Sequence, residues 1–373
     1  MKNNLYNKII TLIFILFLSL SFIGLAFGIT STKENTEWRK LAEFPKINTQ
    51  LKLNEFPKKF EQFYNDNFGL RNILLRINAT IYFGVFNQSP AVGVIKNSKD
   101  WYFHNEPRFM APNYSLYYDH IIFSDQQLSA IGDIFLADKM WLNQKNIPYL
   151  FVIVPDKEVI YPEYFPYPEF INSKIQLSQI LGVLNAKGIP TMYLGPNIAQ
   201  AKKLSDVAMF YRQDAHWSSV GAFYGYQALM QRLKEYFPYS ESLTLSDFDI
   251  KVDSVSLPRG FDLNRLKSLM TNISDSAEPV LDFQVKDGVL DKINKIDKVV
   301  IYADSYFVGD PARNYLGGSL NYLRYNFKNI VVIDDSLWGL EKSKIEQEKP
   351  SIVIREIIQR NLYKYYAQTG IKD

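Results

Sequence analysis

The sequence predicts an α/β domain built on a parallel β-sheet, and two observations support this prediction. From residue 149 onward, short apolar runs of strand length recur: Tyr149–Val154, Thr191–Leu194, Val299–Ala303, Ile330–Ile333 and Ile352–Ile354. Segments with apolar residues at helical spacing lie between several of these runs. Short apolar strands that alternate with amphipathic helices are typical of a parallel sheet covered by helices.

Two of the predicted helices have clear boundaries. The first has an apolar face over residues 177–184 and ends at Gly188 and Pro190, which cannot continue a helix. The second begins at Ser218 or Ser219, both good N-cap residues. Its apolar positions fall along one stripe: Phe223, Tyr226, Met230 and Leu233. We interpret this stripe as core packing and not as a ligand site.

The N-terminal segment predicts a single membrane-spanning helix. The run Ile9–Ile29 contains no charged residue and is preceded by Lys2 and Lys8. Its length is sufficient to cross a bilayer as a helix. A cleaved signal peptide is the alternative, although the run exceeds the usual signal length and no clear small-residue cleavage site follows it. We therefore expect a retained anchor.

These patterns divide the chain into three parts. Residues 1–30 form the expected anchor, residues 31–60 a stalk and entry helix, and residues 61–373 the α/β domain. Within this domain, residues 237–297 show no regular periodicity. They predict an insertion of loops, with or without a hairpin.

Composition excludes several classes of function. The 42 basic residues are interspersed with 39 acidic ones, so a nucleic-acid partner is not expected. The absence of Cys excludes thiol nucleophiles, disulfides and thiolate metal sites. The 3 histidines lack the spacing of a zinc motif, and no phosphate-binding glycine loop is present. We therefore expect neither a metal nor a cofactor.

The motif Asp214-x-His216, directly before the second helix, is the strongest chemical signal. On an extended segment, residues two apart point to the same side, so this carboxylate can hold this imidazole as a general base requires. A surface pair that only precedes a helix is the alternative. Because the other histidines, His104 and His120, lie in Tyr-rich, loop-like stretches, we favour a functional pair.

The predicted strand Val299–Ala303 ends in Asp304-Ser305. Ligands of an open parallel sheet bind at the carboxyl ends of the strands, so Ser305 would lie at that edge. Such a strand ending also occurs in proteins without catalysis. Together with a histidine held by an aspartate, however, Ser305 completes a set of nucleophile, base (His216) and orienting carboxylate (Asp214).

These motifs and the N-terminal anchor resemble the alginate O-acetyltransferase group of SGNH-hydrolase-like proteins, which includes proteins named for a DHHW motif. Further similar segments are EWRKLAEFP at residues 37–45, YNDNFGLR at 64–71, VPDK at 154–157, IYPE at 160–163 and REIIQR at 355–360. The resemblance implies a triad of Asp214, His216 and Ser305. It also implies a three-layer α/β/α fold that is circularly permuted, because the aspartate and histidine precede the serine.

The chain departs from the family pattern at Ala303-Asp304-Ser305-Tyr306, where relatives commonly have Gly-Asp-Ser-Phe. The Gly and Asn segments that complete an SGNH oxyanion hole are not identifiable, and the Ser305 N–H is one expected donor. Five residues are candidate substrate contacts, with structural roles as the alternative: Trp217, Tyr306, Arg313, Asp156 and Lys157.

The resulting prediction is a serine-dependent O-acetyltransferase that acts on an extracytoplasmic polysaccharide through an acyl-serine intermediate. The resemblance implies a multi-pass membrane acyltransferase as the partner that supplies acetyl groups. We expect a single-pass protein of the cell membrane with a periplasmic or extracellular catalytic domain. A carbohydrate acetylesterase with the same triad is one alternative. A non-catalytic scaffold of a polysaccharide or cell-wall modification complex is another.

Overall fold

The computed structural model describes most of the chain, with gaps: residues 2–26, 40–46, 54–67, 69, 71–90, 94–97, 99–104, 123–167, 173–256, 277–308, 318–334, 339–362 and 364–365. The described residues fall into two compact units, those up to residue 97 in the first and those from residue 99 onward in the second. The domain boundary expected at residue 60 stays a prediction.

The first unit contains helices α1 (Lys2–Ala26), α2 (Phe56–Asn67) and α3 (Arg71–Gly84), and strand β1 (Val94–Lys96). Residues 40–46 are tied to α2, because Ala42 N–H donates to Asp66 Oδ2 at 2.8 Å and Asn67 Nδ2 donates to Ala42 O at 2.8 Å. Two of the segments that resemble the family therefore hold each other.

Helix α1 covers most of the expected anchor, whose residues 27–29 lie outside the described part. Within the described residues, no helix combines the length and the apolar character that crossing a membrane requires. The anchor therefore stays a prediction.

The second unit is built on a five-stranded sheet in the order β4-β3-β9-β7-β8, with every neighbouring pair parallel. This confirms the predicted α/β class. The strands are β3 (Tyr149–Val154), β4 (Thr191–Tyr193), β7 (Ile296–Ala303), β8 (Phe327–Asp334) and β9 (Ile352–Ile358). Strand β9 runs further than its apolar run predicted, because Arg355 and Glu356 continue it as fully buried charged residues.

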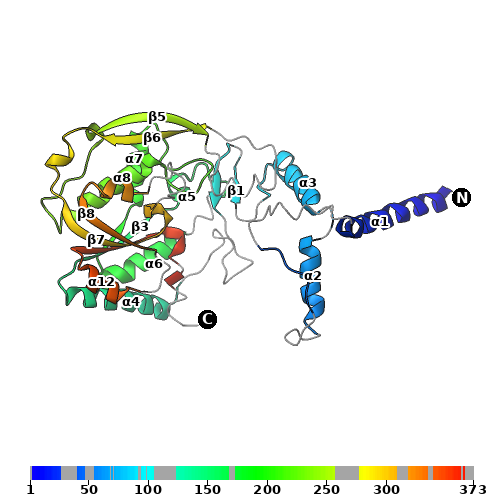
Figure 1. Ribbon diagram of the computed structural model, residues 1–373, viewed down its shortest axis with the longest axis horizontal. Coiled ribbons are helices and arrows are strands. Elements are labelled where there is room, and N and C mark those ends of the chain that lie inside the picture. Colours follow the sequence, from blue (N-terminus) through cyan, green and yellow to red (C-terminus); the bar gives the residue numbers. More distant parts are fainter. Residues whose placement is uncertain are drawn as a thin grey trace. The chain divides into compact units, whose positions relative to one another are not determined.

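Helices cover the sheet on both faces (Figure 1). Helices α4 (Asp125–Asn143), α6 (Ser173–Ala186) and α12 (Lys342–Glu348) share a buried apolar cluster with alternate residues of β3, β7 and β9. Helices α7 (Gly195–Leu204) and α8 (Ser219–Leu233) contact each other and lie across the sheet from this cluster (Figure 1). The sheet is therefore apolar on both faces, which is why its strands read as unbroken apolar runs.

Short helices fill the connections. They are α5 (Lys157–Ile160), α10 (Ser305–Val308), α11 (Leu320–Leu323) and the 3₁₀ turns η2 (Leu245–Asp247), η3 (Leu290–Lys292) and η4 (Gln359–Asn361). Strand β2 (Tyr102–His104) precedes the sheet in the chain. Two of these helices, α5 and α10, follow the strands β3 and β7 at the carboxyl edge of the sheet.

The region expected as an insertion contains an antiparallel hairpin of β5 (Phe248–Ser256) and β6 (Ala277–Val285). Its inner residues Phe248 and Phe283 pack on Phe223 of α8, with ring centroids 5.6 and 5.1 Å away. Ile250 and Val252 are 37% and 64% exposed. Among the side chains that the structure describes, neither face of the hairpin is buried along its length, which explains why the sequence lacks regular periodicity.

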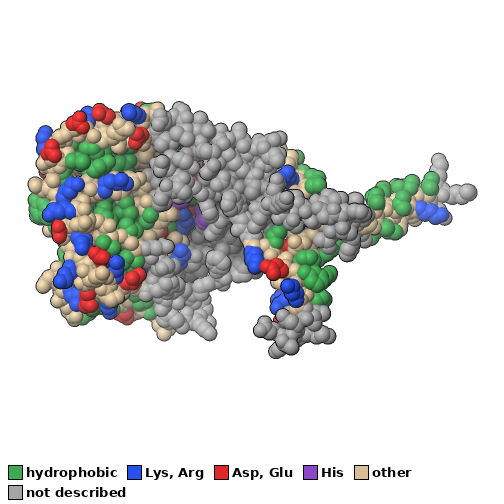
Figure 2. All heavy atoms as spheres, in the orientation of Figure 1, with side chains coloured by type: hydrophobic (Ala, Val, Ile, Leu, Met, Phe, Trp, Pro, Cys, Tyr) green, Lys and Arg blue, Asp and Glu red, His purple; other side chains and the backbone are tan. Residues whose placement is uncertain are grey.

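Basic and acidic side chains are mixed over the visible face of the second unit (Figure 2).

Candidate active site

Asp214, His216 and Ser305 lie together in the second unit, as the sequence predicted. His216 Nδ1 is 2.7 Å from Asp214 Oδ1, and His216 Nε2 is 2.8 Å from Ser305 Oγ. The Asp214 side chain is fully buried, whereas that of His216 keeps 16% exposure. If Nδ1 carries the proton toward the carboxylate, Nε2 is free to accept the serine proton. The geometry is that of a nucleophile paired with an oriented general base.

A bent loop, and not the extended segment we expected, brings Asp214 and His216 together. Residues 212–216 are a series of bends closed by an isolated bridge between Phe210 and Trp217. Asp214 Oδ1 accepts both the backbone N–H of His216 at 2.8 Å and its ring Nδ1 at 2.7 Å. One carboxylate oxygen therefore fixes the backbone turn and the imidazole at once.

Helix α8 anchors the far end of this loop. Its N-cap Ser218 accepts the Gly221 N–H at 3.2 Å and donates to Ala208 O at 2.6 Å. Gly221 is needed because a Cβ there would lie 2.1 Å from Met209 O. The loop is thus held tightly against the first turn of the helix.

Ser305 is the first residue of α10, directly after β7 and Asp304. Asp304 Oδ1 accepts the Tyr306 N–H and Oδ2 accepts the Ile358 N–H, each at 2.9 Å. The Asp304 N–H in turn donates to Glu356 Oε2 at 3.0 Å. These bonds fix the serine turn to the end of β9. They form with Ala303 as the last residue of β7 and without a positive φ there, so this turn does not require the glycine of relatives.

The substrate contacts expected at five residues stay a prediction. Four of the five side chains are buried: Trp217, Tyr306, Asp156 and Lys157 are 1%, 0%, 1% and 2% exposed. Arg313 lies outside the described residues. Trp217 and Tyr306 are adjacent to triad residues in sequence and Asp156 and Lys157 follow a strand, and neither signal distinguishes a buried side chain from an exposed one.

Three of the four contact a triad residue or its neighbour, and Asp156 pairs with Arg360. Trp217 Nε1 donates to Tyr306 O at 2.9 Å, and its ring lies on Phe307 with centroids 6.2 Å apart. The Tyr306 ring lies against the His216 ring at 4.9 Å. Asp156 accepts a bond from Arg360 at 2.8 Å. Lys157 donates to backbone carbonyls, one of them that of Asp214 at 3.0 Å.

Asp304, Glu356 and Arg360 were not predicted to have a role in the site. A usable signal was present, since Arg355-Glu356 interrupts an apolar strand and Arg360 follows it closely. A charged residue inside a buried strand needs partners, and those partners gather at the carboxyl edge of the sheet. Across the described ranges, no group of three or more His, Asp or Glu side chains is placed to hold a metal ion.

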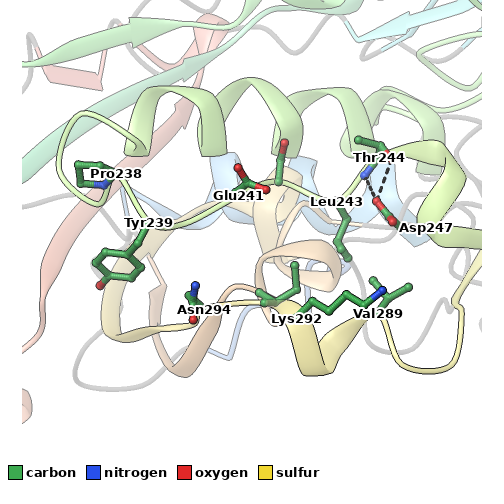
Figure 3. A pocket seen from close by; sticks show the side chains of 11 residues that line it. Pro238, Tyr239, Glu241, Leu243, Thr244, Asp247, Val289, Lys292 and Asn294 are labelled. Carbon is green, nitrogen blue, oxygen red and sulfur yellow. Dashed lines mark hydrogen bonds between the residues drawn. The ribbon is translucent and has the colours of Figure 1, made fainter.

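A pocket of about 470 Å³ lies elsewhere in the second unit (Figure 3). It is lined by residues 238–247, which follow α8, and residues 289–294, which precede β7. Ser305 follows the last residue of the same strand. The pocket and the triad are therefore at opposite ends of β7.

The chain is similar to proteins of known family. Residues 116–282 match the family model of the SGNH hydrolase-like domain of the acetyltransferase AlgX; this stretch contains Asp214 and His216 and ends before Ser305. Over 217 residues the chain is 25% identical to the "Probable alginate O-acetylase AlgJ" of Pseudomonas aeruginosa, a match that covers 57% of this chain and 49% of that protein. The chain thus spans about half the length of the curated relative it matches.

Two solved structures are also similar. The O-acetyltransferase domain of Pseudomonas putida AlgJ is 18% identical, with a TM-score of 0.49 over 74% of this chain and 98% of that one. Bacillus cereus PatB1 is 15% identical, with a TM-score of 0.48 over 72% and 97%. The family match confirms the resemblance to SGNH-hydrolase-like alginate O-acetyltransferases that the motifs predicted.

Proposed function

We propose that this chain is a serine-dependent O-acyltransferase that passes an acetyl group to a hydroxyl of an extracytoplasmic polysaccharide. The proposal depends on the position of His216 between the other two residues. Its Nδ1 is 2.7 Å from Oδ1 of the buried Asp214, and its Nε2 is 2.8 Å from Ser305 Oγ. The choice of acetyl and of a polysaccharide is supported by the similarity to AlgX and AlgJ, which are described as an acetyltransferase and an alginate O-acetylase.

In the first half-reaction, Ser305 Oγ attacks the acetyl carbonyl of the donor while His216 Nε2 takes the serine proton. Asp214 stabilises the imidazolium that forms. The Ser305 N–H donates to the oxyanion of the tetrahedral intermediate. The imidazolium then gives its proton to the leaving oxygen of the donor, which leaves acetyl-Ser305.

In the second half-reaction, a sugar hydroxyl attacks the acetyl-Ser305 carbonyl and His216 takes the proton of that hydroxyl. Collapse of the intermediate releases the O-acetylated sugar, and Ser305 Oγ recovers the proton. Water competes for the same acyl group. A bound acceptor outcompetes water when its effective molarity is high, and well-oriented groups reach about 10⁵ M or more.

Product identity tests this proposal. The purified full chain is incubated with a small acetyl ester and candidate bacterial polysaccharides, and NMR measures O-acetylated glycan and free acetate. We expect acetylated glycan with the native protein and with Ser240→Ala, a buried serine outside the triad, and none with Ser305→Ala. Release of acetate alone, in the presence of every acceptor, would assign the carbohydrate esterase. No reaction of any ester with the native protein would favour the scaffold.

The proposal includes a retained anchor over Ile9–Ile29, a catalytic domain outside the cytoplasm, and an acetyl-supplying multi-pass membrane acyltransferase. The uncharged run and the resemblance support these features. Protease added to spheroplasts should digest the domain. Without protease, the whole protein should stay with the membrane fraction. A mature chain that begins near residue 29 and washes off membranes would contradict the anchor.

A further inference from the structure

The loop of residues 212–216 carries both Asp214 and His216, yet it is neither helix nor strand. Three of its backbone carbonyls accept bonds from side chains that lie outside the loop. Lys157 Nζ donates to Arg212 O at 2.8 Å and to Asp214 O at 3.0 Å. Tyr306 Oη donates to Ala215 O at 2.5 Å. Lys157 and Tyr306 thus hold the carbonyls of Arg212, Asp214 and Ala215 from two directions.

Lys157 holds the loop from the end of β3. It is the first residue of α5, is 2% exposed, and donates a third bond to Tyr102 O at 2.6 Å. Its ammonium also lies 5.0 Å from the ring centroids of Trp101 and Phe103. An ammonium has three N–H donors, and three carbonyls receive them here. A buried ammonium is tolerated only with such partners, so the cation and the loop conformation depend on each other.

Tyr306 holds the loop from the end of β7. Its hydroxyl donates to Ala215 O and accepts a bond from Arg360 Nη1 at 3.1 Å. The same Nη1 is 2.8 Å from Asp156 Oδ1. Burial raises the pKa of Tyr306 well above its usual range, so the hydroxyl stays protonated and can donate at every working pH. A donor that itself accepts from a cation is polarised and bonds more strongly.

Lys157 and Tyr306 are connected to each other through Asp156 and Arg360, and they contact the segments that carry Ser305 and His216. Asp156 and Lys157 are consecutive at the end of β3, and Tyr306 directly follows the nucleophile Ser305. The Tyr306 ring also packs on the His216 ring, with an angle of 31° between their planes. A bond from Tyr306 to Ala215 therefore joins the backbone that carries the serine to the backbone that carries the histidine.

We infer that Lys157 and Tyr306 form a two-armed clamp that positions His216 against Ser305, with Arg360 and Asp156 supporting the Tyr306 arm. These are positioning residues, since none of them reaches the reacting atoms. The inference rests on the proposed function, because the positioned pair is the base and nucleophile of that reaction. A misplacement of about 1 Å costs on the order of 10²-fold in rate, so small movements of the loop are sufficient to matter.

Tyr306→Phe tests one arm with the smallest change, because it removes a single hydroxyl and keeps the ring on His216. Tyr322→Phe is the matched control. Tyr322 is 5% exposed and donates to another backbone carbonyl, Ser219 O, at 3.0 Å. Tyr306→Phe loses two buried hydrogen bonds and Tyr322→Phe loses one, so the stability loss of Tyr306→Phe should be about twice as large and is measured alongside. If Tyr306 were only structural, the two would behave alike toward substrate.

Single-turnover acylation by a small acetyl ester separates the two roles. We expect Tyr306→Phe to lower the acylation rate at saturating ester by about 10- to 100-fold. The half-saturating ester concentration should stay within about 3-fold, since the hydroxyl touches no substrate. Tyr322→Phe should keep both values within about 2-fold of the native protein. A folded Tyr306→Phe protein with the native acylation rate would overturn the clamp.

Proton NMR of the His216 Nδ1–H gives a readout that needs no catalysis. This proton is hydrogen-bonded to Asp214 and should give a far-downfield signal in the native protein and in Tyr322→Phe. We expect the signal to broaden or shift in Tyr306→Phe, and more so in Lys157→Met if that variant folds. An unchanged signal in Tyr306→Phe would contradict the clamp. A native protein that shows these signals but never becomes acylated would instead overturn the proposed function.

Discussion

The two ends of strand β7 are both polar, yet they differ in how their polar groups are used. At the carboxyl end, Asp304 and the fully buried Glu356 bond to backbone N–H groups around Ser305. At the amino end, beside the pocket of Figure 3, Thr244 bonds to Asp247 at the surface through both its N–H and its hydroxyl. At the carboxyl end, the side chains of Asp304 and the buried Glu356 fix the turn between β7 and α10, whereas at the amino end side chains at the surface close a local turn.

This difference has an energetic consequence. A buried carboxylate is tolerated only with compensating partners, and leaving a buried donor or acceptor unsatisfied costs about 1–3 kcal/mol. Groups at the surface can bond to water instead, so the loss of an exposed hydrogen bond costs less. Polar composition alone therefore does not identify a site. Buried polar groups that hold backbone at the carboxyl edge of the sheet do.

The largest expected effect is at the carboxyl end, where Ser305 and His216 act as one unit. Ser305→Ala and His216→Ala should each reduce the hydrolysis of a small acetyl ester by about 10⁴-fold or more. The double variant should lose little further activity, because either deletion already disables the same step. Initial rates of the three variants measure this. Losses that multiply in the double variant would mean that the two residues belong to separate machinery.

The parts of this end that the sequence predicted are those with a local signal. Strand β7 was predicted from its apolar run, and the triad from a motif and a strand ending. The supporting roles of Tyr306 and Lys157 were not predicted, because each depends on a carbonyl of the loop at residues 212–216, far away in the sequence. Residues so far apart in sequence come into contact only when the chain folds and the strands of the sheet lie side by side.

The second prediction concerns the serine turn. Asp304→Ala removes the acceptor of the Tyr306 and Ile358 N–H groups. Because leaving a buried donor unsatisfied costs about 1–3 kcal/mol, we expect the free energy of unfolding to fall by about 2–4 kcal/mol. Urea unfolding at an unchanged m-value measures the loss. A decrease below about 0.5 kcal/mol would show that the turn does not depend on this side chain.

The third prediction concerns Trp217, a candidate substrate contact. Since this ring is 1% exposed and its N–H donates to Tyr306 O, Trp217→Phe should disturb the triad equally for every substrate. Glycan transfer and small-ester hydrolysis should fall by the same factor, within about 3-fold of each other, with a stability loss of about 1 kcal/mol. A selective loss of transfer would restore a role in acceptor binding.

The smallest expected effect is at the amino end of β7. Asp247→Ala removes exposed bonds to Thr244, so unfolding free energy should change by about 0.5 kcal/mol and esterase activity by less than about 2-fold. Thermal unfolding and initial rates measure both. A large loss of activity from this variant would mean that the two ends of the strand are coupled, and would remove the contrast between them.

Acyl mapping by mass spectrometry tests the central claim most directly. The native protein and Ser305→Ala are mixed briefly with a small acetyl ester, quenched in acid and digested. We predict an acetyl group on the peptide that contains Ser305 in the native protein and on no serine in the variant. The acetyl group should disappear when a polysaccharide acceptor is added before quenching. Turnover without acetyl-Ser305, or full activity in Ser305→Ala, would contradict the account.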